Sequence, residues 1–145
     1  MSCPDAAGAP QPEPFFWPVR VYYEDTDAGG VVYYANCLKF TERARSEWLR
    51  ACGFEQTELA QQHGVILVVR SAEIDYLRPA RFNDSLQVSV ELIKVGAGQI
   101  HLVQRVLRND DLLAKVAVRI ACVGLTTMRP TRIPKVLATR IRTGL

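Results

Sequence analysis

Long apolar runs, clustered cysteines and paired histidines are all missing from this sequence, and each absence excludes a class of protein. A membrane-spanning helix needs about 18 or more consecutive apolar residues, and the 145 residues contain no such run. Structural zinc sites use four closely spaced ligands. The four cysteines form no C-x-x-C pair, and His63 and His101 stand apart from each other and from every cysteine. We therefore expect neither a membrane span nor a metal site.

The first residues also lack the features of a secretory signal. They read MSCPDAAGAPQPEPFF, with neither a basic segment nor an apolar one. Their proline, alanine and glycine content predicts a flexible tail over residues 1–14. Free thiols without a signal are typical of a reducing compartment. We therefore expect a cytoplasmic protein, with at most peripheral contact at the inner-membrane face.

Composition and charge favour one globular domain, which we place at residues 15–137. Hydrophobic residues make up 48% of the chain and charged residues 23%, which suits a single core. The net charge is +3, and basic residues gather near the end, where residues 138–145 are predicted to form a basic tail. Such a tail can contact nucleic acid, an anionic membrane or a phosphorylated cofactor, or simply be solvated. No nucleic-acid-binding motif occurs, so we expect no nucleic-acid partner.

Hydrophobic patterning predicts one strand, a long helix and then four more strands. Val19, Val21 and Tyr23 alternate with polar neighbours, which predicts that they share one face. Asn36 is the expected N-cap of the long helix. The predicted strands cover residues 17–25, 65–77, 85–95, 99–107 and 112–123, and the predicted helices cover 36–52 and 57–63. Tight turns between the last strands favour antiparallel pairing, so we predict an α+β fold with a curved five-stranded sheet around the long helix.

The segment from Tyr23 to Asn36, YEDTDAGGVVYYAN, has the most unusual chemistry. A helix N-terminus has unpaired N–H groups and a partial positive charge, so it can polarise a carbonyl as an oxyanion hole does. A carboxylate a few residues upstream can attack that carbonyl or activate water against it. An aspartate in such a loop is more often a cap or turn residue. The pattern alone leaves both interpretations open.

These residues carry a resemblance to a known family. The stretch WPVRVYYEDTDAGGVVYYANCLKFTERARSEWL resembles the hotdog-fold thioesterases of the 4-hydroxybenzoyl-CoA thioesterase type. Within that family it is most similar to the Tol–Pal-associated acyl-CoA thioesterases of Gram-negative bacteria. The resemblance runs from about Phe16 to Lys135 and includes the later segments YLRPARFND and RPTRIPK.

The resemblance implies roles for residues of the first motif. Asp27 matches the catalytic aspartate, which acts as nucleophile or general base towards the thioester carbonyl. Tyr34 matches the residue whose backbone N–H polarises that carbonyl. Gly29, Gly30 and Val31 match the substrate-binding turn. The resemblance also implies a hotdog fold and a homo-oligomer, a dimer or a dimer of dimers with sites between subunits. It implies no metal or redox cofactor, because coenzyme A enters as part of the substrate.

Two positions depart from the family pattern. The Tol–Pal-associated relatives usually have histidine at the position of Tyr34, whereas the 4-hydroxybenzoyl-CoA branch has tyrosine. A role for the backbone N–H survives this change. Cys37 lies where an aromatic residue is common. Both departures alter the residues expected around the acyl group, so the sequence leaves the choice of acyl group open.

Other charged residues have candidate roles in binding or structure. Arginine forks match phosphate oxygens, so we consider five basic residues as ligands for the CoA phosphates or, equally, as ordinary surface charge: Arg70, Arg78, Arg81, Arg132 and Lys135. Asp25 is predicted to hold the loop by accepting backbone N–H groups. Glu42 is predicted to pair with Arg43, Arg45 or a basic group of another subunit, with catalysis as the less favoured alternative.

The sequence therefore predicts an acyl-CoA thioesterase, in which Asp27 and the Tyr34 N–H act on the thioester to release a free acid and CoA. The alternative is a non-catalytic partner of acyl carrier protein or of phospholipid-synthesis enzymes at the inner membrane. The basic residues are compatible with both.

Overall fold

The computed structural model describes residues 13–144, so most of the predicted N-terminal tail lies outside the described residues. The elements, in chain order, are β1 (Phe15–Arg20), η1 (Tyr23–Asp25), α1 (Tyr34–Ala51), α2 (Gln56–Glu58), η2 (Leu59–His63), β2 (Val65–Tyr76), β3 (Ser85–Val95), β4 (Gln99–Arg108), β5 (Asp111–Gly124) and α3 (Lys135–Thr143). Within these residues, no helix has the length and apolar character needed to cross a membrane.

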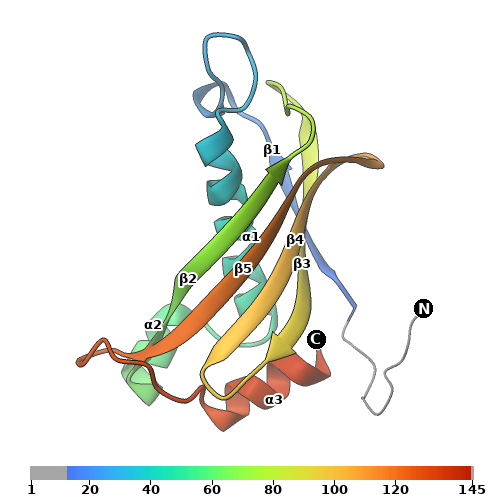
Figure 1. The fold of residues 1–145 in the computed structure, drawn as a ribbon. Helices are drawn as coiled ribbons and strands as arrows, with labels where there is room; N and C mark the ends of the chain where they lie inside the picture. Colours follow the sequence, from blue (N-terminus) through green and yellow to red (C-terminus); the bar gives the residue numbers. More distant parts are fainter. Residues whose placement is uncertain (1–12, 145) are drawn as a thin grey trace.

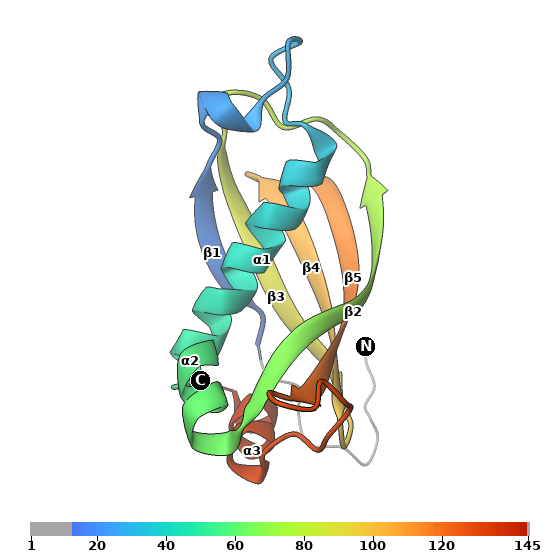
Figure 2. The same cartoon turned by 90° about the vertical axis from the view of Figure 1, so that its left-hand side faces the viewer.

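The strands form one antiparallel sheet in the order β1-β3-β4-β5-β2. The last three strands in sequence are joined by short turns, as predicted, while β2 crosses to the far edge. Figure 1 shows the sheet curving, and Figure 2 shows α1 lying along its concave face. The predicted α+β arrangement, a five-stranded sheet wrapped around a long helix, is confirmed.

The core lies between α1 and the concave face of the sheet. Helix α1 buries one stripe of residues at helical spacing, including Phe40, Ala44 and Trp48. These contact the inward-facing side chains of the strands, such as Val88 and Leu102. Because every second residue of a strand faces the same side, the alternation of apolar and polar residues in the sequence predicts which side chains are buried.

The first strand is shorter than predicted. Strand β1 ends at Arg20, and residues 23–25 form a tight helical turn instead of continuing the strand. The Asp25 side chain accepts the N–H of Tyr22 over 2.9 Å, and this bond closes the turn. Tyr23 therefore points to solvent and is 79% exposed, whereas Val19 and Val21 are buried. The prediction that Tyr23 shares their face is wrong.

The long helix begins two residues earlier than predicted. Tyr33 occupies the N-cap position without a side-chain cap, and α1 starts at Tyr34. Asn36, the expected N-cap, is buried inside the first turn, and its side-chain N–H donates to the Asp25 carbonyl over 3.0 Å. Asn36 thus ties the helix to the preceding loop rather than capping its own N–H groups.

The predicted basic tail at residues 138–145 is mostly a helix. Helix α3 covers Lys135–Thr143, and its apolar stripe, Leu137, Ala138 and Ile141, is buried. Arg140 and Arg142 lie on its outer side. The basic residues belong to an amphipathic helix. This helix covers the end of the sheet opposite the start of α1 (Figure 1).

Candidate active site

The loop between η1 and α1 is held at both of its ends by one carbonyl group. The Asp25 carbonyl accepts the backbone N–H of Tyr33 over 3.1 Å and the side-chain N–H of Asn36 over 3.0 Å. Asp25 also closes the turn before it, as described above, so its predicted structural role is confirmed. Residues 26–32 therefore project from a fixed base.

Asp27 begins a tight turn within this loop. Its N–H donates to the Val31 carbonyl over 2.9 Å, and its own carbonyl accepts the N–H of Gly30 over 3.0 Å. Its Oδ1 accepts the N–H of Gly29 over 2.8 Å. The side chain is exposed, and its Oδ2 has no hydrogen-bond partner among residues 13–144. One oxygen thus orients the carboxylate, while the other is available to a substrate or a water molecule.

Both glycines of the turn are required by its geometry. Gly30 has φ of 79°, a left-handed conformation that side chains disfavour. At Gly29 a Cβ would lie 3.3 Å from Asp27 Oδ1, which is closer than ordinary contact. Gly29 therefore allows the backbone to lie close to the carboxylate, and Gly30 allows the left-handed conformation that the turn needs.

Tyr34 supplies the first N–H of α1. This N–H has no hydrogen-bond partner in the described part of the chain, as expected for the first turn of a helix. The partial positive charge of the helix N-terminus adds to its donor strength. A carbonyl oxygen placed here would be stabilised as it gains negative charge.

A pocket of about 280 Å³ adjoins this N–H. Tyr34 and Cys37 of α1 form one wall. The last residue of β2 and the segment after it, residues 76–80, form the other. Burial raises the pKa of the Cys37 thiol, so Cys37 lines the pocket as a small neutral group. The pocket is mainly apolar and opens next to Tyr34.

The second motif of the resemblance, YLRPARFND, lies against the first. The Val32 N–H donates to the Ala80 carbonyl over 2.7 Å, and Val31 forms a β-bridge with Arg81. Arg78 lines the pocket and forms an exposed ion pair with Asp111 over 3.5 Å. The fold therefore brings Arg78 and Arg81 next to the Asp27 loop.

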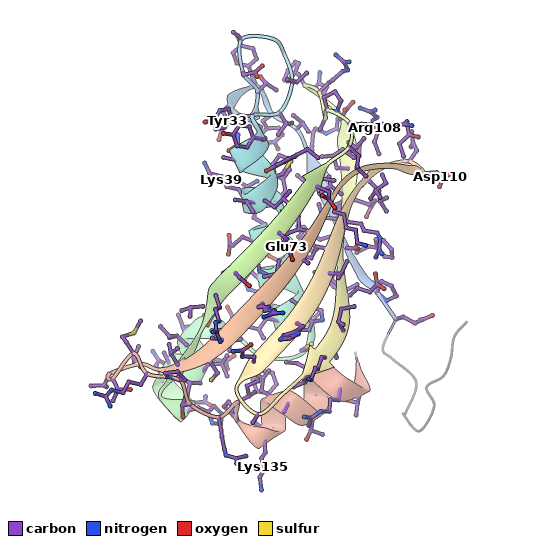
Figure 3. All side chains as sticks on the ribbon, viewed as in Figure 1. Tyr33, Lys39, Glu73, Arg108, Asp110 and Lys135 are labelled. Atoms are coloured by element: carbon purple, nitrogen blue, oxygen red, sulfur yellow. The ribbon has the colours of Figure 1, made fainter. Side chains whose placement is uncertain are left out.

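The remaining phosphate candidates lie elsewhere in the chain. Arg70 is in the middle of β2, and Arg132 and Lys135 are near the start of α3. Figure 3 shows Lys135 at the opposite end of the molecule from Tyr33, which precedes the first residue of α1. Within one chain, Arg132 and Lys135 are therefore not brought together with Asp27.

Two further predictions concern charged groups. Glu42 accepts a hydrogen bond from Ser46 Oγ over 2.9 Å, and within residues 13–144 it forms no ion pair with Arg43 or Arg45; its pairing with another subunit's basic group stays a prediction. Arg45 instead donates to Gln104 in the core, and desolvation by burial lowers its pKa. Over the same described range, no three histidine, cysteine or acidic side chains gather in a way that could bind a metal ion.

Sequence reasoning missed Tyr76. Its hydroxyl donates to the Tyr34 carbonyl over 2.9 Å, and its ring lines the pocket. The available signal was its position at the start of the YLRPARFND segment, of which only the arginines were predicted to have a role.

A curved five-stranded antiparallel sheet wrapped around a long helix is the architecture of a hotdog-fold protein, and here it holds a carboxylate, a free helix N-terminal N–H and a pocket. A solved structure of a probable thioesterase from Bartonella henselae matches with a TM-score of 0.81 and 35% identity, covering 84% of this chain and 100% of that one. The model of the thioesterase-like superfamily matches residues 21–141, and the chain belongs to this family. The predicted fold and family are thus confirmed.

Two relatives are similar over most of their length. The acyl-CoA thioesterase YbgC of Haemophilus influenzae is 47% identical over 121 residues, which cover 83% of this chain and 89% of the relative. The acyl-CoA thioester hydrolase YbgC of Escherichia coli O6:H1 is 43% identical over 122 residues, covering 83% and 90%.

Proposed function

We propose that this protein hydrolyses acyl-CoA thioesters to a free carboxylic acid and CoA. The observation that carries the proposal is the position of the Asp27 carboxylate, held in a fixed turn with one oxygen free, in the loop that leads to the unpaired N–H of Tyr34. Membership of the thioesterase-like superfamily and the names of the two YbgC relatives support the same reaction.

In the proposed reaction the thioester oxygen accepts a hydrogen bond from the Tyr34 N–H. Negative charge develops on that oxygen as the carbonyl carbon is attacked, and the helix N-terminus stabilises this charge. In one route Asp27 attacks the carbon itself, the C–S bond breaks as the CoA thiolate leaves, and water cleaves the resulting anhydride to the free acid and the Asp27 carboxylate. In the other route Asp27 takes a proton from the attacking water, the C–S bond breaks, and that proton passes to the leaving CoA thiolate. Both routes use the free oxygen of Asp27 and require no metal or redox cofactor.

We further propose that two copies join through the edge strand β2. An edge strand offers unpaired N–H and carbonyl groups to another strand, and β2 pairs with β5 on one side only. The Gln56 side chain hydrogen-bonds the N–H and carbonyl of Leu67, so the free edge begins after that residue. Antiparallel pairing of the free edge with its copy would bring Val69 of one chain near Tyr76 of the other.

This pairing would complete the acyl site. A groove of about 240 Å³ between α1 and β2 has an apolar part that includes Trp48, Leu67 and Val69, beside charged and polar residues of α1 and the segment after it. In the proposed dimer it lies beside the Tyr34 pocket of the second copy, so the acyl group would rest between subunits. A dimer of dimers would preserve the same arrangement.

The CoA phosphates are assigned to arginines near the loop. Arg78 and Arg81 are placed there by the segment after β2, and guanidinium groups suit phosphate oxygens. Arg70, Arg132 and Lys135 lie away from the loop of their own chain, and the last two can contribute only from another subunit.

The test is hydrolysis of a panel of short, long and aromatic acyl-CoAs by the wild type and by Asp27→Asn. We expect the substitution to lower turnover about 10²–10⁴-fold, because it removes the base or nucleophile, and to leave the fold intact. Glu24→Gln is the matched control, since it removes an exposed carboxylate three residues away and should keep full turnover.

Near-normal turnover in Asp27→Asn would contradict the assignment of Asp27. No turnover by the wild type on any acyl-CoA would instead favour the alternative, a non-catalytic partner of acyl carrier protein, and binding to acidic acyl carriers would then be measured.

A further inference from the structure

One hydrogen bond ties the end of the edge strand to the start of the long helix. Tyr76 ends β2, and its hydroxyl donates to the carbonyl oxygen of Tyr34 over 2.9 Å. The two rings meet edge to face with their centroids 5.7 Å apart. Both residues line the same pocket, so this contact lies within the proposed active site.

The helix does not need this bond for its own closure. In an α-helix the carbonyl of residue i accepts the N–H of residue i+4, and a carbonyl oxygen has two lone pairs. The Tyr76 hydroxyl can therefore bond to Tyr34 without displacing a helical hydrogen bond. Burial, followed by the influence of Cys37 and Tyr34, raises the pKa of the Tyr76 phenol, so the hydroxyl stays protonated at neutral pH. The bond fixes the position of the first helical turn relative to β2.

The Tyr34 N–H is thereby held from both sides along the backbone. On the preceding side, the Tyr33 N–H donates to the Asp25 carbonyl, which also accepts the Asn36 side chain from the first turn of α1. On the following side, the Tyr76 hydroxyl holds the carbonyl of Tyr34 itself. Between these anchors the direction of the Tyr34 N–H has little freedom.

We infer that Tyr76 is a positioning residue for thioester hydrolysis, because its hydroxyl holds the first turn of α1 so that the Tyr34 N–H faces the developing oxyanion. This inference rests on the proposed function. A donor that is aimed in advance lowers the barrier more than one that must reorient. The oxyanion forms only in the transition state, so the effect belongs to kcat rather than to substrate binding.

The test is Tyr76→Phe, which keeps the ring and removes the hydroxyl. With an acyl-CoA that the wild type accepts, we expect kcat to fall about three- to tenfold, the range of one neutral hydrogen bond. KM and the pH dependence of turnover should not change, because the ring that lines the pocket is kept and the hydroxyl transfers no proton. Thermal unfolding confirms that the variant is folded.

Tyr33→Phe is the matched control. The Tyr33 ring stacks on Tyr34 with centroids 5.1 Å apart, but its hydroxyl donates to no group in residues 13–144, so kcat should stay at the wild-type value. Backbone NMR gives a readout that does not need turnover. The amide resonance of Tyr34 should shift in Tyr76→Phe by more than it does in Tyr33→Phe.

Three outcomes would overturn the inference: an unchanged kcat in Tyr76→Phe, a raised KM with unchanged kcat, or equal amide shifts in the two variants. A wild type that hydrolyses no acyl-CoA would overturn the proposed function together with it. A wild type with turnover that Tyr76→Phe matches would overturn only the role of Tyr76.

Discussion

At the scale of single residues, Gly30 is the loop position whose backbone conformation most restricts the residue type. Its φ of 79° is left-handed, and an added Cβ would meet no atom within 4 Å. Space is therefore available, and the restriction comes from the backbone alone. Because the Gly30 N–H also closes the turn on the Asp27 carbonyl, strain at Gly30 would be transmitted to Asp27.

We predict that Gly30→Ala lowers both stability and turnover. The left-handed conformation costs a non-glycine residue about 1–2 kcal/mol, and relief of that strain would move Asp27. A small misplacement of a catalytic group can reduce turnover by about a hundredfold. Gly64→Ala is the control, because Gly64 has φ of 66° and equally open surroundings outside this loop. Urea unfolding should show similar losses for both variants, and only Gly30→Ala should lose activity. Equal activities would contradict a positional role for the turn.

Part of the site can be predicted residue by residue. Asp25 was expected to accept backbone N–H groups, and it does. The pattern left open whether Asp27 is a turn residue or a catalytic one. Its side chain closes a turn by accepting the Gly29 N–H, and its second carboxylate oxygen has no partner in residues 13–144. Tyr76 could not be predicted, because its partner Tyr34 is 42 residues away in sequence. No local pattern predicts which strand ends beside the start of α1.

At the scale of elements, hydrophobic periodicity predicts the bounds of a strand or helix well where one of its faces is buried and the other is solvated. Strands β3, β4 and β5 and helix α1 begin and end within two residues of their predicted bounds. The end of β1 was missed because the Asp25 side chain, rather than hydrophobicity, turns the chain there. Helix α3 was missed because five of its nine residues are basic or polar and its buried apolar stripe is narrow.

We predict that α3 contributes to the stability of the domain. Leu137 is fully buried, so Leu137→Ala should lower the free energy of unfolding by about 2–5 kcal/mol. The control is Val136→Ala on the exposed side of the same helix, where surface substitutions change stability by about 0.5 kcal/mol or less. Urea unfolding measures both. Equal, small changes would mean that α3 is the solvated tail that the sequence first suggested.

At the scale of the whole molecule, the proposed acyl site needs a second copy of the chain. The Asp27 loop and the Tyr34 pocket lie at one end, and Figure 1 shows β2 uncovered along the edge of the sheet. The apolar groove between α1 and β2 has no covering segment within residues 13–144. A second copy paired on β2 would cover the groove and place it beside the other copy's pocket. Sequence patterns could predict strand β2. They could not predict that its free edge and the proposed active site lie at the same end of the molecule.

Oligomeric state and turnover should therefore be lost together. Val69 is half-exposed at the edge of the groove, and Val69→Asp would bury an unpaired carboxylate at the junction of each copy, which opposes pairing. We expect light scattering to show the wild type as a multiple of 16.2 kDa and the variant as a monomer with little turnover. Val136→Asp, an exposed apolar position on α3, should keep both mass and turnover. A monomeric wild type, or a monomeric Val69→Asp with full turnover, would show that each chain builds its site alone, because the groove would then contribute nothing to the acyl group bound in the second copy.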